Sequence, residues 1–443
     1  MGTVYRVYGL RQQRLRPLSP FAYARRTMSW FDTARFGLFV HWSHSSQQGI
    51  ELSWPLVGGN FALPLCSDVT VDDYHATAET FDPQAWDARE LARMAKRLGM
   101  QYAVITAKHH DGYAMFHTAQ SDFSIERSPF GRDIVREFVD AMRDEGLRAG
   151  VYFSLIDWRH PDYPAFTEAD KPYAFGKWRQ PSPEQWARYT EFMFGQVREL
   201  LTAYGKIDLI WFDGGWERTA DQWRSRELAE LIRSLQPDIL INDRLPGVGD
   251  FETPEQLVPA QPPDRPWETC MTMNESWGYN AADAQWKSSR RLIHTLCEVA
   301  GRGGNLLLNV GPMGDGRLQP EALERLGDVE RWMAANKESI VGTEPGLEPW
   351  QCYGPSTRKG TTVFYVHLLM RPYETVSVRG VPIKRLRSVR ALSTGEELAF
   401  ETRSGIIESL GPDPLGEATV RVPANAIDEY ATVLALEFAE AAG

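Results

Sequence analysis

Short apolar runs alternate with longer amphipathic segments along the first three-quarters of the chain. The apolar runs predict strands at residues 35–42, 102–108, 148–154, 207–212, 238–242 and 305–310. The amphipathic segments predict helices at residues 83–98, 133–145, 182–204, 221–235, 284–300 and 321–338. Repeated strand–helix units indicate a parallel sheet. The predicted fold class is therefore α/β, and at this length a (β/α)8-type barrel, regular or irregular, is favoured over an open doubly wound sheet.

The pattern changes after about residue 345. Short strands are predicted at residues 361–368, 375–379, 386–392, 419–422 and 432–438, with no long amphipathic helix between them. We therefore expect a catalytic barrel over residues 21–345 and an accessory β-sandwich over residues 346–443. Residues 1–20 are rich in Arg and lack the apolar core of a signal peptide, which predicts a disordered extension.

Composition narrows the choice of partner. The formal net charge of −11 argues against a nucleic acid or an anionic membrane surface. No apolar run approaches the 18 or so residues that a membrane span needs. Without a recognisable export signal we expect a cytoplasmic protein, of bacterial source, while the oligomeric state is left open. Fifteen Trp residues suit a site that stacks on sugar rings, although most aromatic rings must serve the core.

Polar side chains follow most of the predicted barrel strands. They are His41, His44, His109, His110, Asp111, Asp157, Asp213, Asp243, Arg244 and, where a sixth strand is expected to end, Glu268. The carboxyl ends of parallel barrel strands converge on one mouth. We therefore expect these groups to form one site rather than a set of unrelated caps and turns.

Two carboxyl groups in such a mouth suggest glycoside hydrolysis. Asp213 ends a nearly wholly apolar strand and is followed by Gly214 and Gly215, although a turn or helix-capping role is the simpler alternative. A retaining enzyme needs one carboxylate as nucleophile and a second as acid/base about 5 Å away. Asp213 and Glu268 are 55 positions apart (268 − 213), which is compatible with different strands of one barrel.

Several motifs carry a more specific resemblance. They are RFGLFVHW at 35–42, TAKHHDGY at 106–113, WFDG at 211–214, NDR at 242–244, WE at 267–268, SWGY at 276–279 and GGNLLLNVGP at 303–312. In this order, between Trp30 and Pro312, they resemble the retaining α-L-fucosidases of glycoside hydrolase family 29. The region after residue 345 also resembles the C-terminal domain of that family.

The resemblance implies roles for the candidate residues. Asp213 matches the nucleophile, and Glu268 is our choice for the acid/base, with Glu275 as the alternative and Glu51 as a more distant one. Anionic Asp213 is expected to raise the pKa of Glu268 until the glycosyl ester forms, after which Glu268 acts as the base.

The remaining candidates are expected to bind the sugar. The residues matched to hydroxyl recognition or to the acid/base region are His41, His109, His110 and Arg244. Trp54 lies in a loop that departs from the form common in the family. Aromatic side chains that could line the ring, or serve only the core, are Tyr152, Trp211 and Trp277.

The implied activity is exo-hydrolysis of terminal α-L-fucosyl linkages with retention, on a fucosylated oligosaccharide or glycoconjugate, with no metal or cofactor. Three rivals remain open. A metal hydrolase could use His41, His109, His110 and Asp213 as ligands. The barrel could act on a related sugar, an α-galactoside or a β-D-fucoside, or it could bind fucose without catalysis.

Overall fold

The computed structural model describes residues 30–58, 69–172 and 179–440. The predicted extension at residues 1–20 lies outside the described residues. A seven-stranded parallel sheet curls through the first part of the chain, in the order β5-β4-β3-β2-β1-β7-β6. Its strands are β1 (Phe36–Val40), β2 (Tyr102–Lys108), β3 (Arg148–Ser154), β4 (Leu209–Asp213), β5 (Leu240–Ile241), β6 (Glu268–Thr272) and β7 (Asn305–Val310).

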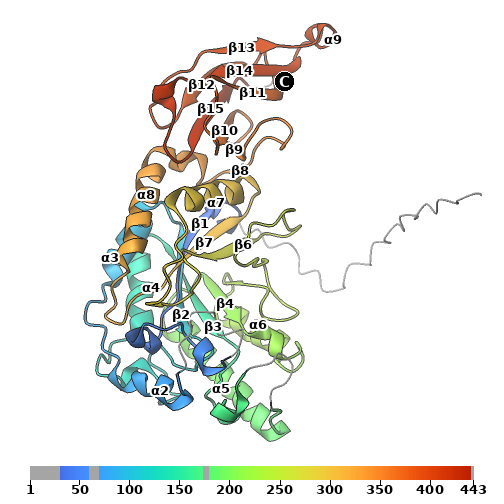
Figure 1. Ribbon diagram of the computed structural model, residues 1–443. Helices are drawn as coiled ribbons and strands as arrows, with labels where there is room; N and C mark the ends of the chain where they lie inside the picture. Colours follow the sequence, from blue (N-terminus) through green and yellow to red (C-terminus); the bar gives the residue numbers. More distant parts are fainter. Residues whose placement is uncertain (1–29, 59–68, 173–178, 441–443) are drawn as a thin grey trace, which may run out of the picture.

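The helices of the barrel lie mostly on the outer side of this sheet (Figure 1). They are α1 (Phe31–Ala34), α2 (Val71–Ala76), α3 (Ala88–Arg97), α4 (Ile134–Asp144), α5 (Pro183–Ala203), α6 (Ser225–Leu235), α7 (Ser289–Gly301) and α8 (Pro320–Asn336). The strands are buried on both faces, which explains why their sequences read as continuous apolar runs. Leu38 and Val40 face the helices, whereas Phe39 between them faces a second apolar cluster inside the curled sheet with Tyr152 and Trp211.

A short segment joins the two edge strands of the curled sheet. Residues 251–256 make isolated parallel bridges, Phe251 with Asn242 after β5 and Glu255 with Cys270 of β6. The backbone N–H of Cys270 donates to the Pro254 carbonyl at 3.1 Å, and that of Gln256 donates to the Cys270 carbonyl at 2.9 Å. The segment therefore occupies the position of a further barrel strand without forming a regular one.

Two antiparallel sheets follow the barrel. One has the order β12-β15-β10-β9-β8 and the other the order β11-β14-β13. Their strands are β8 (Glu344–Pro345), β9 (Ser356–Lys359), β10 (Val363–Leu368), β11 (Thr375–Pro382), β12 (Leu386–Ala391), β13 (Phe400–Arg403), β14 (Leu415–Arg421) and β15 (Thr432–Phe438); a short helix, α9 (Ile406–Ser409), precedes β14. An apolar core fills the space between the sheets. The α/β fold class with a C-terminal β-domain is thus confirmed, while the exact boundary at residue 345 stays a prediction.

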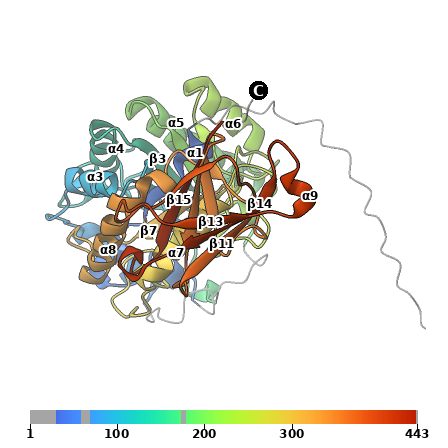
Figure 2. The ribbon, with the colours of Figure 1, turned by 90° about the horizontal axis from the view of Figure 1, so that it is seen from above.

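The β-domain packs on the barrel through α7 and α8 (Figures 1 and 2). Tyr365, Val433 and Ala435 belong to the same apolar cluster as the barrel helices. The indole of Trp332 donates to the Ala431 carbonyl at 2.9 Å. This continuous apolar contact favours a bracing role for the domain. Within the described ranges, no helix has both the length and the apolar character that a membrane span requires.

Candidate active site

Asp213 is the last residue of β4, and its carboxylate lies at a cavity. The backbone turns directly after it, because Gly214 has a φ of +79° and a Cβ there would lie 2.5 Å from a carbon of Ile156. Tyr152 Oη donates to Asp213 Oδ2 at 2.8 Å, and Arg244 Nη1 donates to Oδ1 at 3.0 Å. Burial alone would lower the pKa of Arg244, but the neighbouring Asp213 carboxylate raises it above its usual range. Asp213 is therefore held as an oriented anion, the form that a nucleophile needs.

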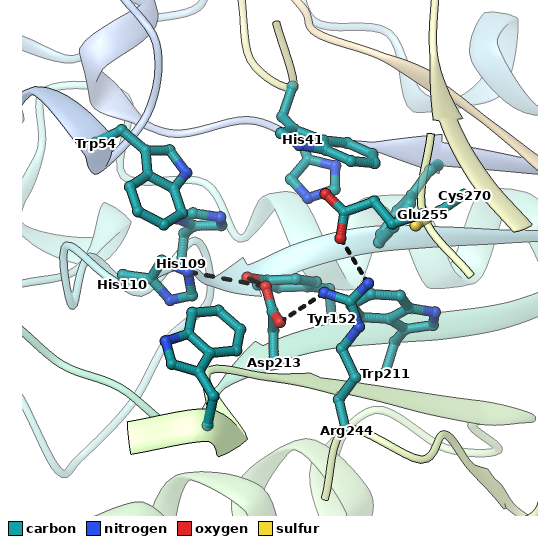
Figure 3. A pocket seen from close by; sticks show the side chains of 13 residues that line it. His41, Trp54, His109, His110, Tyr152, Trp211, Asp213, Arg244, Glu255 and Cys270 are labelled. Carbon is teal, nitrogen blue, oxygen red and sulfur yellow. Dashed lines mark hydrogen bonds and ion pairs between the residues drawn. The ribbon is translucent and has the colours of Figure 1, made fainter. Parts of the chain in front are cut away.

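The cavity has a volume of about 370 Å³. The structure brings together at its wall Asp213 and the eight residues expected to bind substrate: His41, Trp54, His109, His110, Tyr152, Trp211, Arg244 and Trp277. Figure 3 shows those of these side chains that it labels pointing into one space, from different strands and from the loops that follow them. Four further lining residues were not singled out from the sequence: Phe39, Trp216, Glu255 and Cys270.

Three histidines form one side of this wall. Their Nδ1 atoms each contact a polar side chain behind the ring: Asn309 Oδ1 for His41 at 2.7 Å, Ser53 Oγ for His109 at 2.6 Å and Ser154 Oγ for His110 at 2.6 Å. Burial lowers the pKa of His41 to about 4 and places the pKa values of His109 and His110 well below their usual range. The rings are therefore neutral near pH 7 and suited to hydrogen-bonding hydroxyl groups.

Glu268 does not line this cavity, and the expectation from the sequence that it does is wrong. It is the first residue of β6 rather than the last, paired with Asn305 at the start of β7. Its carboxylate is fully buried and accepts hydrogen bonds from Tyr102 Oη and, at 3.0 Å, from Trp211 Nε1. Cys270, two residues along the strand and therefore on the same face, is the β6 residue that lines the cavity. A general acid must reach the glycosidic oxygen, so a carboxyl group that lines the cavity is better placed for this role than Glu268.

The two other carboxyl candidates also lie away from the cavity wall. Glu275 stands in the loop after β6, with its side chain 62% exposed and 4.0 Å from Lys287 Nζ. Glu51 is buried, and its carboxylate accepts the backbone N–H groups of Leu52, Trp277 and Gly278 at 2.6–2.9 Å. Glu51 therefore holds the loop that carries Trp277.

Glu255 is the second carboxyl group in the cavity. Its Oε2 accepts a hydrogen bond from Arg244 Nη2 at 2.6 Å, so one guanidinium holds both Glu255 and Asp213 (Figure 3). The Asp213 side chain is 11% exposed and that of Glu255 is 39% exposed. Glu255 therefore stands at the solvent side, where a leaving group would depart. Its surroundings in the sequence, residues 246–263, have several Pro and no strand periodicity, so no local signal marks it.

The site could also hold a cation. Ligand atoms of His109, His110 and Asp213 lie within 4.8 Å of one another, and all three residues are buried. His110 Nε2 is 3.8 Å from Asp213 Oδ2. A metal hydrolase, the alternative to a metal-free glycosidase, would bind its ion at this cluster, so this alternative can be tested.

Comparison with known proteins identifies the family. The sequence model described as Alpha-L-fucosidase matches residues 10–338. The chain belongs to this family. The tissue alpha-L-fucosidase of Macaca fascicularis is 30% identical over 390 residues, covering 80% of this chain and 78% of the relative. The human tissue alpha-L-fucosidase is 29% identical over 385 residues, with the same coverage.

Solved alpha-L-fucosidase structures match most of the chain. The alpha-L-fucosidase isoenzyme 1 of Paenibacillus thiaminolyticus has a TM-score of 0.79 and 35% identity, covering 93% of this chain and 99% of the other. A family 29 alpha-L-fucosidase of Bacteroides thetaiotaomicron, trapped as a covalent intermediate, has a TM-score of 0.78 and 25% identity, covering 93% and 96%. The resemblance to the family 29 alpha-L-fucosidases is thereby confirmed.

Proposed function

We propose that this family member is an exo-acting α-L-fucosidase that hydrolyses terminal α-L-fucosyl linkages with retention, through a glycosyl ester on Asp213. The observation that carries the proposal is the pair of carboxyl groups, Asp213 and Glu255, held by Arg244 in one cavity. Retaining hydrolysis needs two carboxyl groups about 5 Å apart on either side of the scissile bond. This assignment replaces Glu268 by Glu255 as the acid/base.

In the first step, an Asp213 carboxylate oxygen attacks the anomeric carbon. The glycosidic C–O bond breaks as the leaving oxygen takes the Glu255 proton. Formation of the neutral ester removes one negative charge from the cavity. Glu255 is then the remaining carboxylate, hydrogen-bonded to Arg244, and it acts in the next step.

In the second step, Glu255 takes a proton from water, and the water oxygen attacks the anomeric carbon. The bond to Asp213 breaks, so that two inversions give net retention. Tyr152 and Arg244 donate to Asp213 as it leaves as an anion again. No step of this sequence requires a metal or a cofactor.

The shape of the cavity supports action on one terminal sugar. Its volume of about 370 Å³ is at the small end of ligand pockets, which suits a single ring. Phe39 and Trp277 add an apolar wall, with ring centroids 6.2 Å apart, beside the polar histidines. Such a wall suits the methyl group of fucose better than the hydroxymethyl group of galactose. The expected substrates are fucosylated oligosaccharides or glycoconjugates.

The test is hydrolysis of 4-nitrophenyl α-L-fucoside, with the first-formed anomer of fucose read by NMR. Initial release of α-L-fucose is the expected result. Initial β-L-fucose would mean inversion and remove Asp213 as a nucleophile. Turnover of an α-galactoside or β-D-fucoside, but not of the α-L-fucoside, would favour a related-sugar enzyme. If the protein binds fucose but hydrolyses none of these three glycosides, it is a fucose-binding protein without catalytic activity.

The metal alternative is tested in the same assay. Enzyme dialysed against a chelator is expected to keep its full rate, since the two carboxyl groups carry the chemistry. A rate that falls with chelation and returns with Zn²⁺ would favour a metal site on His109, His110 and Asp213.

A further inference from the structure

The side chains that contact Nδ1 of the three cavity histidines determine which ring nitrogen of each histidine carries the hydrogen. We propose that His109 presents an Nε2–H donor to the sugar, whereas His41 and His110 present bare Nε2 acceptors. The pattern is set by positioning residues that do not line the cavity. The positions of these hydrogens follow from contacts within the protein, and only their consequence for sugar recognition rests on the proposed function.

For His110 the deciding residue is Ser154. The Ser154 hydroxyl donates to the Ile156 carbonyl at 2.8 Å, and a hydroxyl has only one hydrogen. At the 2.6 Å contact with His110 Nδ1, the Ser154 oxygen must therefore accept. His110 thus carries its hydrogen on Nδ1, and its Nε2 lone pair lies 3.8 Å from Asp213 Oδ2.

For His41 the deciding residue is Asn309. Its amide Nδ2 donates to the Trp277 carbonyl at 2.7 Å, and a carbonyl can only accept, which fixes the orientation of the amide. The amide oxygen consequently faces His41 Nδ1 at 2.7 Å. His41 must donate from Nδ1, which leaves its Nε2 without a hydrogen.

For His109 the deciding residue is Ser53, and the direction is reversed. The Ser53 oxygen accepts the backbone N–H of Asp111 at 2.9 Å. Its hydroxyl hydrogen then has His109 Nδ1, 2.6 Å away, as the acceptor that the described residues provide. His109 Nδ1 is therefore bare, and Nε2 carries the hydrogen.

A neutral ring has a single N–H, and all three rings are buried. Burial is the main cause that keeps their pKa values low, and the nearby Lys108 and Arg244 act in the same direction on His110. Two residues adjacent in the sequence, His109 and His110, therefore hold opposite tautomers. The sugar must offer hydrogens to His41 and His110 and a lone pair to His109.

The direct test is NMR of the ¹⁵N-histidine-labelled free enzyme near pH 7, with two-bond ¹H–¹⁵N correlations that distinguish both tautomers and the cation. Signals are assigned by their loss in His41→Gln, His109→Gln and His110→Gln. The expected result is Nε2–H for His109 and Nδ1–H for the other two. The same tautomer on all three rings, the reverse pattern, or a cation on any ring would overturn the proposal. Since the free enzyme is measured, the result does not depend on whether the protein hydrolyses fucosides.

The role of Ser154 is tested by Ser154→Ala, with Ser154→Thr as the matched control that keeps a hydroxyl. In the alanine variant, His110 Nδ1–H would have no acceptor in a buried site. We therefore expect its hydrogen to move to Nε2, toward Asp213, whereas the threonine variant keeps the native pattern. An unchanged His110 tautomer in a folded Ser154→Ala protein would remove Ser154 as the determinant.

The consequence for recognition is tested with L-fucose and its three monofluoro analogues, by calorimetric binding. Fluorine cannot donate a hydrogen, so the analogue whose fluorine faces His110 should bind about tenfold more weakly than fucose. In Ser154→Ala this ratio should shrink toward one. Each of the three analogues gives a ratio of its affinity to that of fucose. If Ser154→Ala changes none of these three ratios, the acceptor role of His110 is contradicted.

Discussion

The indole nitrogen of Trp211 donates a hydrogen bond of 3.0 Å to Glu268, from a ring that also lines the cavity. Glu268 further accepts the hydroxyl of Tyr102, at the start of β2. This buried carboxyl group therefore fixes the orientation of a cavity wall without entering the cavity. The sequence alone could not distinguish two roles for Glu268, support of the site and proton transfer within it. The hydrogen bond from Trp211 indicates the supporting role.

Glu268→Gln is expected to lower turnover modestly, about tenfold or less, because a glutamine can still hydrogen-bond Trp211. The loss should be equal for substrates with good and poor leaving groups, since no proton transfer is removed. Rates on 4-nitrophenyl α-L-fucoside and on a fucosyl disaccharide provide the measurement. A selective loss on the disaccharide would return the acid role to Glu268.

Glu255→Ala is expected to lose activity selectively on the fucosyl disaccharide. Disaccharide hydrolysis should fall on the order of 10²- to 10⁴-fold, while formation of the glycosyl ester from an activated aryl fucoside changes far less. Added azide should then intercept the ester and give α-L-fucosyl azide, because two inversions still occur. Equal loss on both substrates, with no azide product, would contradict the assignment. Glu275→Ala is the control at an exposed carboxylate outside the cavity wall.

Asp213→Gly is expected to reduce hydrolysis by about 10⁴-fold or more, since no glycosyl ester can form. The fold should persist, because Asp213 lies at the end of β4 and contacts Tyr152 and Arg244 rather than the apolar core. Azide in place of the missing carboxylate attacks once, so any product should be β-L-fucosyl azide. Near-normal turnover by a folded variant would remove Asp213 from the mechanism.

Much of the site could be predicted because it follows strand periodicity. Residues that end parallel strands, such as His41 and Asp213, must meet at one mouth. Tyr152 and Trp211 lie within their strands on the inward face, so alternation along β3 and β4 carries them to the cavity. These positions depend on local patterns that a single sequence displays.

The proposed acid/base, Glu255, could not be found in this way. The short strand β6 mixes polar and apolar residues, so its sequence does not show that Glu268 begins it rather than ends it. Glu255 belongs to a segment held by isolated bridges to residues beside β5 and in β6, so its position depends on tertiary contacts and not on a local pattern. The start of helix α3 was also misplaced by prediction from the sequence. The helix begins at Ala88 and not at Pro83, because the Asp87 side chain caps it by accepting the Glu90 N–H at 2.9 Å.

Trp216 is expected to influence the leaving group rather than the fucose. It lines the cavity, is 42% exposed, and meets the His110 ring edge-on at 5.7 Å between centroids. Trp216→Ala should lower kcat/KM about tenfold for fucosyl disaccharides, whose second sugar can stack on the indole. The inhibition constant of free L-fucose, measured alongside, should stay within about twofold. An equal effect on both would place Trp216 against the fucose ring itself.

The stability of the enzyme should depend on pH through Glu268. Burial raises the pKa of this group from 4.5 to about 7, although Tyr102 and Trp211 hydrogen-bond to it. Between about pH 4.5 and 7 the native state therefore binds more protons than the unfolded chain, so the free energy of unfolding falls as the pH rises through this window. A difference of about 2.5 pKa units corresponds to about 3 kcal/mol. Glu51, whose pKa burial also raises to about 7, contributes in the same direction.

The glutamine in Glu268→Gln carries no charge at any pH. This variant should therefore lack the part of the pH-dependent loss of stability that Glu268 causes. The Tm of the native enzyme should drop between pH 5 and pH 8, and that of the variant should drop by several degrees less, because Glu51 still titrates. Calorimetric scans at the two pH values provide the measurement, with Glu230→Gln as an exposed control that should follow the native enzyme. Equal drops in Tm for all three proteins would mean that Glu268 does not change its protonation on unfolding in this range, and that the hydrogen bonds from Tyr102 and Trp211 offset the cost of its burial.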